Sequence, residues 1–366
     1  MHAMRRITAF YTAVAWLAIP ATRAGAQTLS NPDLSLIGDF RAVGRSEETA
    51  DSTGEKQLGF EFEELEIAFN AYLNPYMRAD VFLGIHGTGP DVDVEEAVMT
   101  VLRGLPASMQ LSAGQYLLDF GKLNTQHPHQ WGWMDRPLMH RTMLGDEGLK
   151  ALGMRANTLI PIGETALGLS ASAFSGSAFE GHEHGAEEQE EAAPEIMGSG
   201  RISLFRQFTD AWSAELGLSY LAGNYDSVEP LSVNMSAVDW KLRWRPDAYR
   251  AFAWVLELMQ SDREVEPDSL ATSIPSVDAW GAFTSAELQW RKRWSAGAFF
   301  DWTQDATVPD AETTAVGGFF DFLPVEETAR IGLVYRHENS DLYAFDNDTI
   351  TLQFLWGMGP HKVHTF

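Results

Sequence analysis

The side chains best suited to chemistry are concentrated in residues 118–148, between segments that alternate in hydrophobicity. Imidazole, carboxylate and guanidinium groups lie close together there, and the residues that carry them are His127, His129, Asp135, Arg136, His140 and Arg141. Charged side chains that face one another across a narrow aqueous passage select the solutes that pass. Asp135 and Arg141 would supply such opposed charges. Because this stretch does not alternate, we interpret it as one long loop.

Two placements of the long loop fit its composition. It folds into the interior of a barrel, where it narrows or plugs the lumen, or it packs on the rim with Trp131 and Trp133 at a membrane interface. In the second placement the histidines are ordinary hydrogen-bonding groups. His127 and His129 are two residues apart with Pro128 between them, which is not a recognised spacing of metal ligands.

A second group of potential ligands lies in the acidic segment 176–199. His182 and His184 flank Glu183, and Glu187 follows. Neutral imidazole and carboxylate groups are zinc ligands, so one interpretation of this tract is weak binding of Zn²⁺. The other is a solvated external loop that binds nothing. No motif in the chain requires a cofactor.

Enzyme motifs are missing from the sequence. It contains no nucleophile elbow, phosphate loop or His-Glu-x-x-His pattern. Local motifs do not reveal a hydrolytic triad whose residues come from distant strands, so this arrangement remains an alternative. The sequence therefore favours a protein that is not an enzyme.

The elements that must position these groups are strands. Segment 234–244 has Val238, Trp240 and Leu242 on one face and charged residues on the other, which is the period of a strand with two different faces. Sixteen such segments are expected: 33–44, 59–72, 76–86, 92–103, 108–117, 148–158, 164–175, 200–208, 211–222, 233–244, 248–260, 277–290, 293–304, 313–322, 328–338 and 348–358. We predict an all-β transmembrane antiparallel barrel of about 16 strands.

The apolar face of these segments carries Trp or Tyr near its ends, as in 280–290 and 294–302. Aromatic girdles at both membrane interfaces are typical of outer-membrane barrels, whereas a soluble sandwich would bury this face. The opposite face would line a water-filled lumen with charges of both signs. The lumen candidates are Arg78, Asp80, Asp239, Lys241, Arg243, Glu257, Arg291 and Arg336.

The two ends of the chain point to export. Residues 1–26 combine Arg5 and Arg6 with an apolar run over 7–19 and a small-residue site before Gln27, which is typical of a Sec-type signal peptide. Residues 27–366 would then form a single barrel in the outer membrane of a Gram-negative bacterium. The terminal Phe366 follows an amphipathic last strand and would present the signal that barrels offer to their insertion machinery.

Charge and cysteine content narrow the class further. The net charge of −25 argues against a nucleic-acid partner. Acidic loops at the mouth of a channel would concentrate cations, so a slight preference for cations is expected. The chain has no cysteine, and a closed barrel is one way for an exported protein to be stable without disulfides.

Several short motifs carry a family resemblance. They are Asn31 to Leu36, Phe120 to Asn124 followed by His127-Pro128-His129, Asp135 to Leu138, and Leu144 to Gly148. With these motifs the chain resembles bacterial porin-type barrels, and more narrowly the small barrels known as zinc-regulated outer-membrane receptors. The resemblance implies an outer-membrane barrel over the whole mature chain. A TonB-dependent receptor needs a plug and about 22 strands, for which this chain is too short.

The sequence therefore favours a channel for passive diffusion of small hydrophilic solutes or ions. Three alternatives remain: a zinc-linked uptake barrel that uses the tract at His182, a structural barrel plugged by the long loop, and a soluble exported β-protein. A homotrimer is the oligomer expected of a wide porin, and the lipid bilayer is its other partner.

Overall fold

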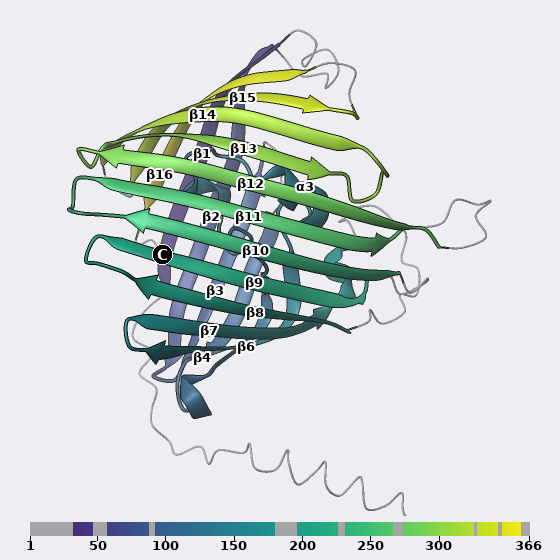
Figure 1. Cartoon of the computed structure of the whole chain (residues 1–366). Coiled ribbons are helices and arrows are strands. Elements are labelled where there is room, and N and C mark those ends of the chain that lie inside the picture. The colour runs from purple at the N-terminus through teal and green to yellow at the C-terminus, as the bar shows by residue number, and fades with distance from the viewer. Residues whose placement is uncertain are drawn as a thin grey trace, which may run out of the picture. The chain divides into compact units, whose positions relative to one another are not determined.

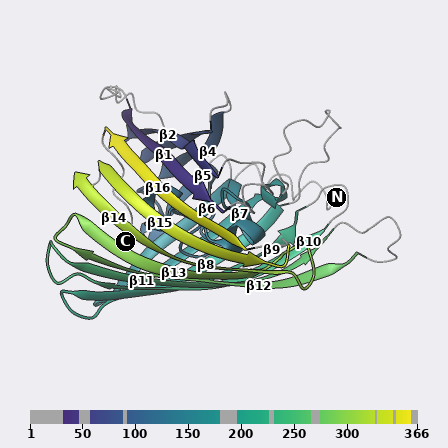
Figure 2. The same cartoon turned by 90° about the horizontal axis from the view of Figure 1, so that it is seen from above.

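A computed structural model shows a closed antiparallel barrel of sixteen strands (Figure 1). The structure describes residues 32–46, 57–87, 92–179, 196–225, 231–265, 274–325, 328–342 and 346–359. Each strand pairs with its neighbours in sequence, and β1 pairs with β16 to close the barrel. Figure 2 shows β14, β15, β16 and β1 curving round to join the two sides of the wall. The prediction of about sixteen antiparallel strands is confirmed.

The strand bounds differ from the predicted ones by a few residues. The strands are β1 (Asp33–Arg45), β2 (Leu58–Asn74), β3 (Met77–His86), β4 (Val92–Val101), β5 (Gln110–Leu117), β6 (Lys150–Ile162), β7 (Thr165–Ser175), β8 (Ile196–Gln207), β9 (Trp212–Asn224), β10 (Ser232–Trp244), β11 (Ala251–Glu264), β12 (Ser276–Trp290), β13 (Trp294–Gln304), β14 (Glu312–Val325), β15 (Ala329–Ser340) and β16 (Asn347–Met358). The helical elements are η1 (Pro106–Ser108), η2 (Pro128–Gln130), α3 (Leu138–Leu144) and η3 (Gly176–Phe179).

The alternation in sequence becomes an alternation of environment. In the β10–β11 ladder Val238 lies opposite Leu258, and the next pair is Asp239 opposite Glu257. Val238 and Leu258 are 41% and 40% exposed on the outside, whereas Asp239 and Glu257 are buried on the lumen side. Successive side chains of a strand point to opposite faces, so one period sorts apolar residues outward and charged residues inward.

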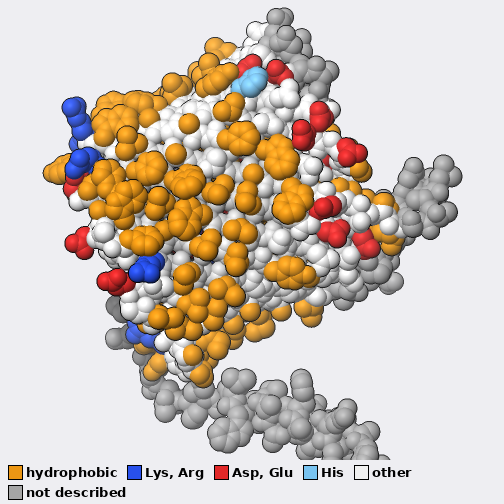
Figure 3. Space-filling view, viewed as in Figure 1, with side chains coloured by type: hydrophobic (Ala, Val, Ile, Leu, Met, Phe, Trp, Pro, Cys, Tyr) orange, Lys and Arg blue, Asp and Glu red, His pale blue; other side chains and the backbone are white. Residues whose placement is uncertain are grey.

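The outer surface is apolar over most of its height (Figure 3). Trp212, Trp280 and Trp356 are among the exposed large hydrophobic residues, and the rings of Trp212 and Trp244 lie 6.1 Å apart near one end of the barrel. A large exposed apolar surface on a folded protein indicates a site of contact with a membrane or with another protein. The closed barrel with its apolar exterior excludes the soluble sandwich that the alternation alone would allow.

The two ends of the barrel differ. At the turn end, where Asp33 and Met358 lie, the connections β2–β3 and β6–β7 are two residues long and β12–β13 is three. The long loop between β5 and β6 leaves from the opposite end, which we call the loop end. On the face in Figure 3, Lys and Arg side chains lie near the turn end and most Asp and Glu side chains near the loop end.

The long loop folds into the lumen. Leu118, Phe120 and Met139 are fully buried, and Trp131 and Trp133 are 3% and 7% exposed. They form one hydrophobic cluster with lumen-facing residues such as Phe283 and Phe319. In Figure 1 the helix α3 of this loop is seen behind the strands β12 and β13 that it contacts. The placement on the rim is therefore wrong, because the two tryptophans pack inside the barrel.

Among the described residues, no helix has both the length and the apolar character that crossing a membrane requires.

Candidate functional site

The base of the long loop is tied by Asn124. Its Nδ2 donates to the carbonyl oxygens of Leu118 at 2.8 Å and Leu149 at 3.2 Å, and its Oδ1 accepts from Leu149 N at 2.9 Å. One fully buried amide thus joins both ends of the loop. Buried backbone groups must find hydrogen-bond partners, so Asn124 replaces the strand ladder where β5 and β6 separate.

Polar contacts then fix the loop to the wall between β9 and β13. Gly121 N donates to Ser219 Oγ at 3.1 Å and Leu123 N to Glu257 Oε2 at 3.2 Å. Gly121 has φ +67°, and a Cβ there would lie 1.6 Å from Glu257 Oε1. Only glycine fits this approach of the backbone to the wall.

The helix α3 is fixed at its start and along its side. Leu138 N, at the first turn, donates to Asp301 Oδ2 at 2.6 Å. Met139 and Met143 are buried against the wall, and an added Cβ at Gly281 of β12 would lie 2.4 Å from Met139 Cβ. Gly281 therefore supplies the space into which α3 packs.

A charged contact joins the loop to the opposite wall. Arg41 Nη1 on β1 donates to Asp135 Oδ1 at 2.8 Å, and Arg41 also pairs with Asp39 at 3.0 Å and with Glu63 at 3.5 Å. The side chain of Asp135 is 42% exposed. Loss of part of its water raises the pKa of Asp135, but Arg41, Arg336 and Arg141 outweigh this and hold that pKa below its usual value.

The predicted opposition of Asp135 and Arg141 needs a correction. The partner of Asp135 is Arg41, which comes from β1 and is 94 residues away in sequence. Arg141 lies on the exposed side of α3 and acts on Asp135 at longer range. The helix α3 packs against β12 and β13, which leaves Arg141 exposed and gives the direct contact with Asp135 to Arg41.

His127 lies in an acidic pocket of the wall. Its Nδ1 is 3.1 Å from Glu95 Oε2 and 3.3 Å from Glu66 Oε2, and its Nε2 is 3.3 Å from Glu96 Oε1. Burial disfavours the charged imidazolium, but the carboxylates outweigh it and raise the pKa of His127 well above its usual value. His127 therefore acts as a cation that holds the loop to β2 and β4.

Two β-bulges create this acidic wall. The β1–β2 ladder pairs Asp39 with Glu64 and then Phe40 with Phe62, so that Glu63 is an extra residue. The β3–β4 ladder pairs Phe82 with Glu96 and then Leu83 with Val94, so that Glu95 is an extra residue. A bulge turns neighbouring residues toward the same side. The sequence analysis did not identify these carboxylates as lumen-facing, because strict alternation would place half of them on the outer face of the barrel.

Arg136 and His140 have structural surroundings. The Arg136 guanidinium lies 5.5 Å from the Trp131 ring, and burial lowers the pKa of Arg136 to about 10, which leaves it charged at neutral pH. His140 Nε2 is 3.3 Å from Glu257 Oε1, and neither side chain is exposed. Both were predicted at a constriction. His140 lies in the contact between loop and wall, whereas Arg136 lines a cavity of the lumen.

Most of the predicted lumen residues lie on the inner face of the wall. Arg78 pairs with Asp80 at 2.8 Å, and Arg336 pairs with Glu338 at 2.9 Å. Asp239 is paired with Arg201. Lys241, Arg243 and Glu257 follow the same inward alternation on β10 and β11.

Arg291 is the exception and corrects the prediction. It lies in the turn between β12 and β13, with φ 52° and an exposed side chain. The alternation does not extend past the end of a strand. His182, Glu183, His184 and Glu187 lie outside the described residues, as do residues 1–26 and Phe366.

Cavities of the lumen lie on both sides of the loop. The outer cavity, of about 480 Å³, lies at the loop end and includes Arg41, His86 and His127 in its lining. A second cavity, of about 200 Å³, lies toward the turn end and includes His129, Leu323 and Thr328. His127 and Pro128 line the first, and His129 and Gln130 line the second. Segment 127–130 therefore forms the partition between them.

Comparison with solved structures gives the same architecture at low sequence identity. The anion-selective porin from Comamonas acidovorans has a TM-score of 0.58 at 10% identity, covering 89% of this chain and 98% of that chain. The outer membrane channel DcaP of Acinetobacter baumannii has 0.54 at 10%, covering 90% and 96%. The trimer form of OmpT of Vibrio cholerae has 0.54 at 8%, covering 90% and 100%. The chain has the fold of the outer-membrane porins.

Comparison at the level of sequence identifies one partial relative and no family. No family model matches the chain. An uncharacterized protein of Aquifex aeolicus is 34% identical over 149 residues, which is 36% of this chain. The match covers only 31% of that relative's length.

Proposed function

We propose that this porin-type barrel is an outer-membrane channel for passive diffusion of small hydrophilic solutes or ions. The observation that carries the proposal is the position of the long loop. It crosses the lumen from β9–β13 to β1, β2 and β4, packs with lumen-facing residues in one hydrophobic cluster, and leaves cavities toward both ends of the barrel. An inward loop with a partly exposed charge pair is how a wide barrel narrows and filters its pore.

The charges of the outer cavity support a preference for cations. Six carboxylates line it, against the four cationic side chains of Arg41, His127, Arg136 and Lys150. A cleft lined by an excess of one sign concentrates counter-ions and speeds their entry. The excess of carboxylates in this cavity supports the slight preference for cations that the acidic loops predict.

The bilayer experiment tests the proposal directly. Residues 27–366, refolded in detergent and checked for the heat-modifiable mobility of a closed barrel, would be inserted into a planar lipid membrane. We expect ohmic conductance steps and, in a KCl gradient, a reversal potential on the cation-selective side. A folded barrel that gives no steps contradicts the channel. It would instead support a structural barrel plugged by the long loop, which the many contacts between loop and wall favour as the second candidate.

The route to the membrane and the assembly belong to the same proposal. Residues 1–26 would direct Sec-type export, Phe366 would be recognised by the insertion machinery, and the apolar exterior would meet lipid and two further copies in a homotrimer. The support is the sequence at both ends, the exposed apolar surface, and the trimer form of OmpT with the same fold. Weak capture of zinc by the tract at His182 is a separate proposal that rests on composition alone.

A further inference from the structure

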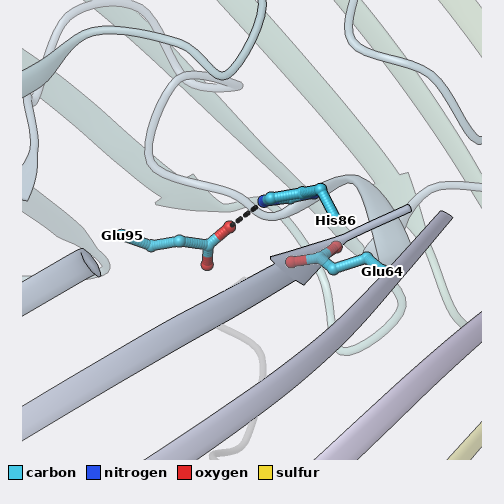
Figure 4. A group of neighbouring side chains, drawn as sticks. All are labelled: Glu64, His86 and Glu95. Carbon is cyan, nitrogen blue, oxygen red and sulfur yellow. Dashed lines mark ion pairs between the residues drawn. The ribbon is translucent and has the colours of Figure 1, made fainter. Parts of the chain in front are cut away.

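A second group of potential ligands lies on the wall of the outer cavity. Glu64 of β2, His86 of β3 and Glu95 of β4 point toward one another, as Figure 4 shows. One donor atom from each lies within 4.8 Å of the others, and His86 Nε2 is 3.9 Å from Glu95 Oε1. Ligands bound about 2.0–2.2 Å from one ion lie at most about 4.4 Å apart. Small side-chain movements would therefore bring all three onto a single ion.

Two of these donor atoms form no hydrogen bond with a described residue, although His86 Nε2 lies 3.7 Å from Glu147 Oε1. Glu64 is 7% exposed, and no donor among the described residues forms a hydrogen bond with its Oε1. The same holds for His86 Nε2. A buried carboxylate oxygen without a partner is costly. The side chains of Glu64 and His86 lie beside that of Glu95 in Figure 4.

Neighbouring trios of similar side chains are already occupied by protein cations. His127 Nδ1 lies 3.1 Å from Glu95 Oε2 and its Nε2 lies 3.3 Å from Glu96 Oε1, so both ring nitrogens already face protein groups. Lys150 pairs with both Asp93 and Glu147, the carboxylates nearest His86 on the other side. Glu95 uses Oε2 for His127 and leaves Oε1 toward His86. In the trio Glu64, His86 and Glu95, the atoms Glu64 Oε1 and His86 Nε2 form no hydrogen bond with a described residue.

The strand between the ligands leaves room for an ion. Gly84 of β3 faces this space, and a Cβ there would lie 2.7 Å from His86 Nε2 and 3.1 Å from Glu95 Oε1. The outer cavity reaches the three ligands, and the side chain of His86 is 39% exposed. An ion could therefore arrive from the loop end without any rearrangement of the barrel.

We propose that Glu64, His86 and Glu95 bind one divalent first-row transition-metal ion, such as Zn²⁺ or Co²⁺, at the loop end of the lumen. Imidazole with carboxylates suits these ions better than Mg²⁺ or Ca²⁺, which prefer sites made only of oxygen. Three protein ligands leave a position for water or an exchanging ligand. The ion would offset the charge of Glu64 and Glu95 and reverse part of the acidic field of the outer cavity.

Metal binding is the readout, so the test does not depend on whether the barrel conducts. Refolded residues 27–366 carrying His182→Ala and His184→Ala would be titrated with Zn²⁺ against a chromophoric chelator, and with Co²⁺ while its visible absorption is recorded. We expect one site per chain that an excess of Mg²⁺ does not displace. His86→Ala and Glu64→Gln should each weaken it by at least about tenfold.

Two further variants make the result specific. His337 on β15 has a side chain 38% exposed and pairs with Asp348, so His337→Ala is a matched control that should leave the affinity unchanged. Gly84→Val keeps every ligand, fills the space and should abolish binding in a barrel that is still heat-modifiable. Binding that is absent, or that survives His86→Ala and Gly84→Val, overturns the proposal. In that case a proton shared by Glu64 and Glu95, and not a metal ion, would neutralise part of the negative charge of these two carboxylates.

Discussion

Arg41 Nη1 donates to Asp135 Oδ1 at 2.8 Å, which joins the first strand of the barrel to a loop 94 residues further along the chain. The contact holds a partly exposed carboxylate beside a buried guanidinium on the wall of the lumen. It also places the loop across the lumen, because the other side of the loop is fixed to Glu257 and Asp301. Both the charge around Asp135 and the position of the loop in the lumen depend on this arrangement.

The first prediction concerns selectivity. Asp135→Asn removes one negative charge from the passage and keeps the shape of the side chain. A unit charge acts on an ion about 4 Å away with about 1 kcal/mol in a water-like medium, so the cation-to-anion permeability ratio should fall about fivefold. Reversal potentials in a KCl gradient measure it. Asp210→Asn, in the exposed turn between β8 and β9, should change nothing, and an equal effect of both variants would contradict the role of Asp135.

The second prediction concerns acid. The pKa of Asp135 is held below its usual value in the folded chain. Its ionisation therefore stabilises the fold fully above the ordinary pKa of about 3.9, and this contribution is lost as the pH falls through the lower folded-state value. Urea unfolding between pH 5 and 3 should show wild type and Asp135→Asn converging at the acid end. A constant difference across this range would show that the charge of Asp135 does not contribute to stability.

The third prediction concerns the space into which α3 packs. Gly281→Val would place side-chain atoms where Met139 now lies, since a Cβ already comes within 2.4 Å of Met139 Cβ. Overpacking of this kind costs about 1–3 kcal/mol, and the barrel can relieve it by releasing the helix. We expect lower stability together with larger or noisier conductance steps.

A matched glycine provides the control for Gly281→Val. A Cβ at Gly198 of β8 would meet no described atom within 4 Å, so Gly198→Val should leave stability and conductance close to wild type. Equal destabilisation by both variants would point to a general effect of losing glycine from a strand rather than to displacement of α3.

The fourth prediction concerns the ion pair between Lys122 Nζ and Glu215 Oε2, which are 2.6 Å apart with side chains 13% and 14% exposed. Removing one partner of a buried pair costs up to about 3–5 kcal/mol, and Arg201, 3.6 Å from Glu215 Oε1, reduces this cost for Lys122→Met. Lys122→Met and Glu215→Gln should each destabilise the fold, and the double variant should be less destabilised than the sum of the two. Strict additivity in this double-mutant cycle would show that the pair is not coupled.

Much of the barrel could be predicted because its signal is local. Val238 and Asp239 differ in polarity and are neighbours in sequence, and a strand must send them to opposite faces. The same argument identified sixteen segments and located Asp239, Lys241 and Glu257 on the inner face. It failed at Arg291, where the strand ends and the side chain belongs to an exposed turn.

The candidate site was only partly predictable. The long loop was recognised by its lack of alternation, and His127 and Asp135 were recognised as charged groups within it. Their partners were missed, because Arg41, Glu66 and Glu95 come from strands 94, 61 and 32 residues away in the sequence. Glu63 and Glu95 also sit at β-bulges, and each bulge breaks the alternation on which the prediction relied.

The sequence by itself determined the class of the fold, since strand period, apolar exterior and polar interior are properties of adjacent residues. Only the tertiary structure decided what fills the lumen. Closure of sixteen strands brings β1, β2, β4, β9, β11 and β13 round one loop, and that encounter sets which charges meet. Arg41 therefore faces Asp135, and Glu64, His86 and Glu95 converge on one point, through contacts that no local pattern encodes.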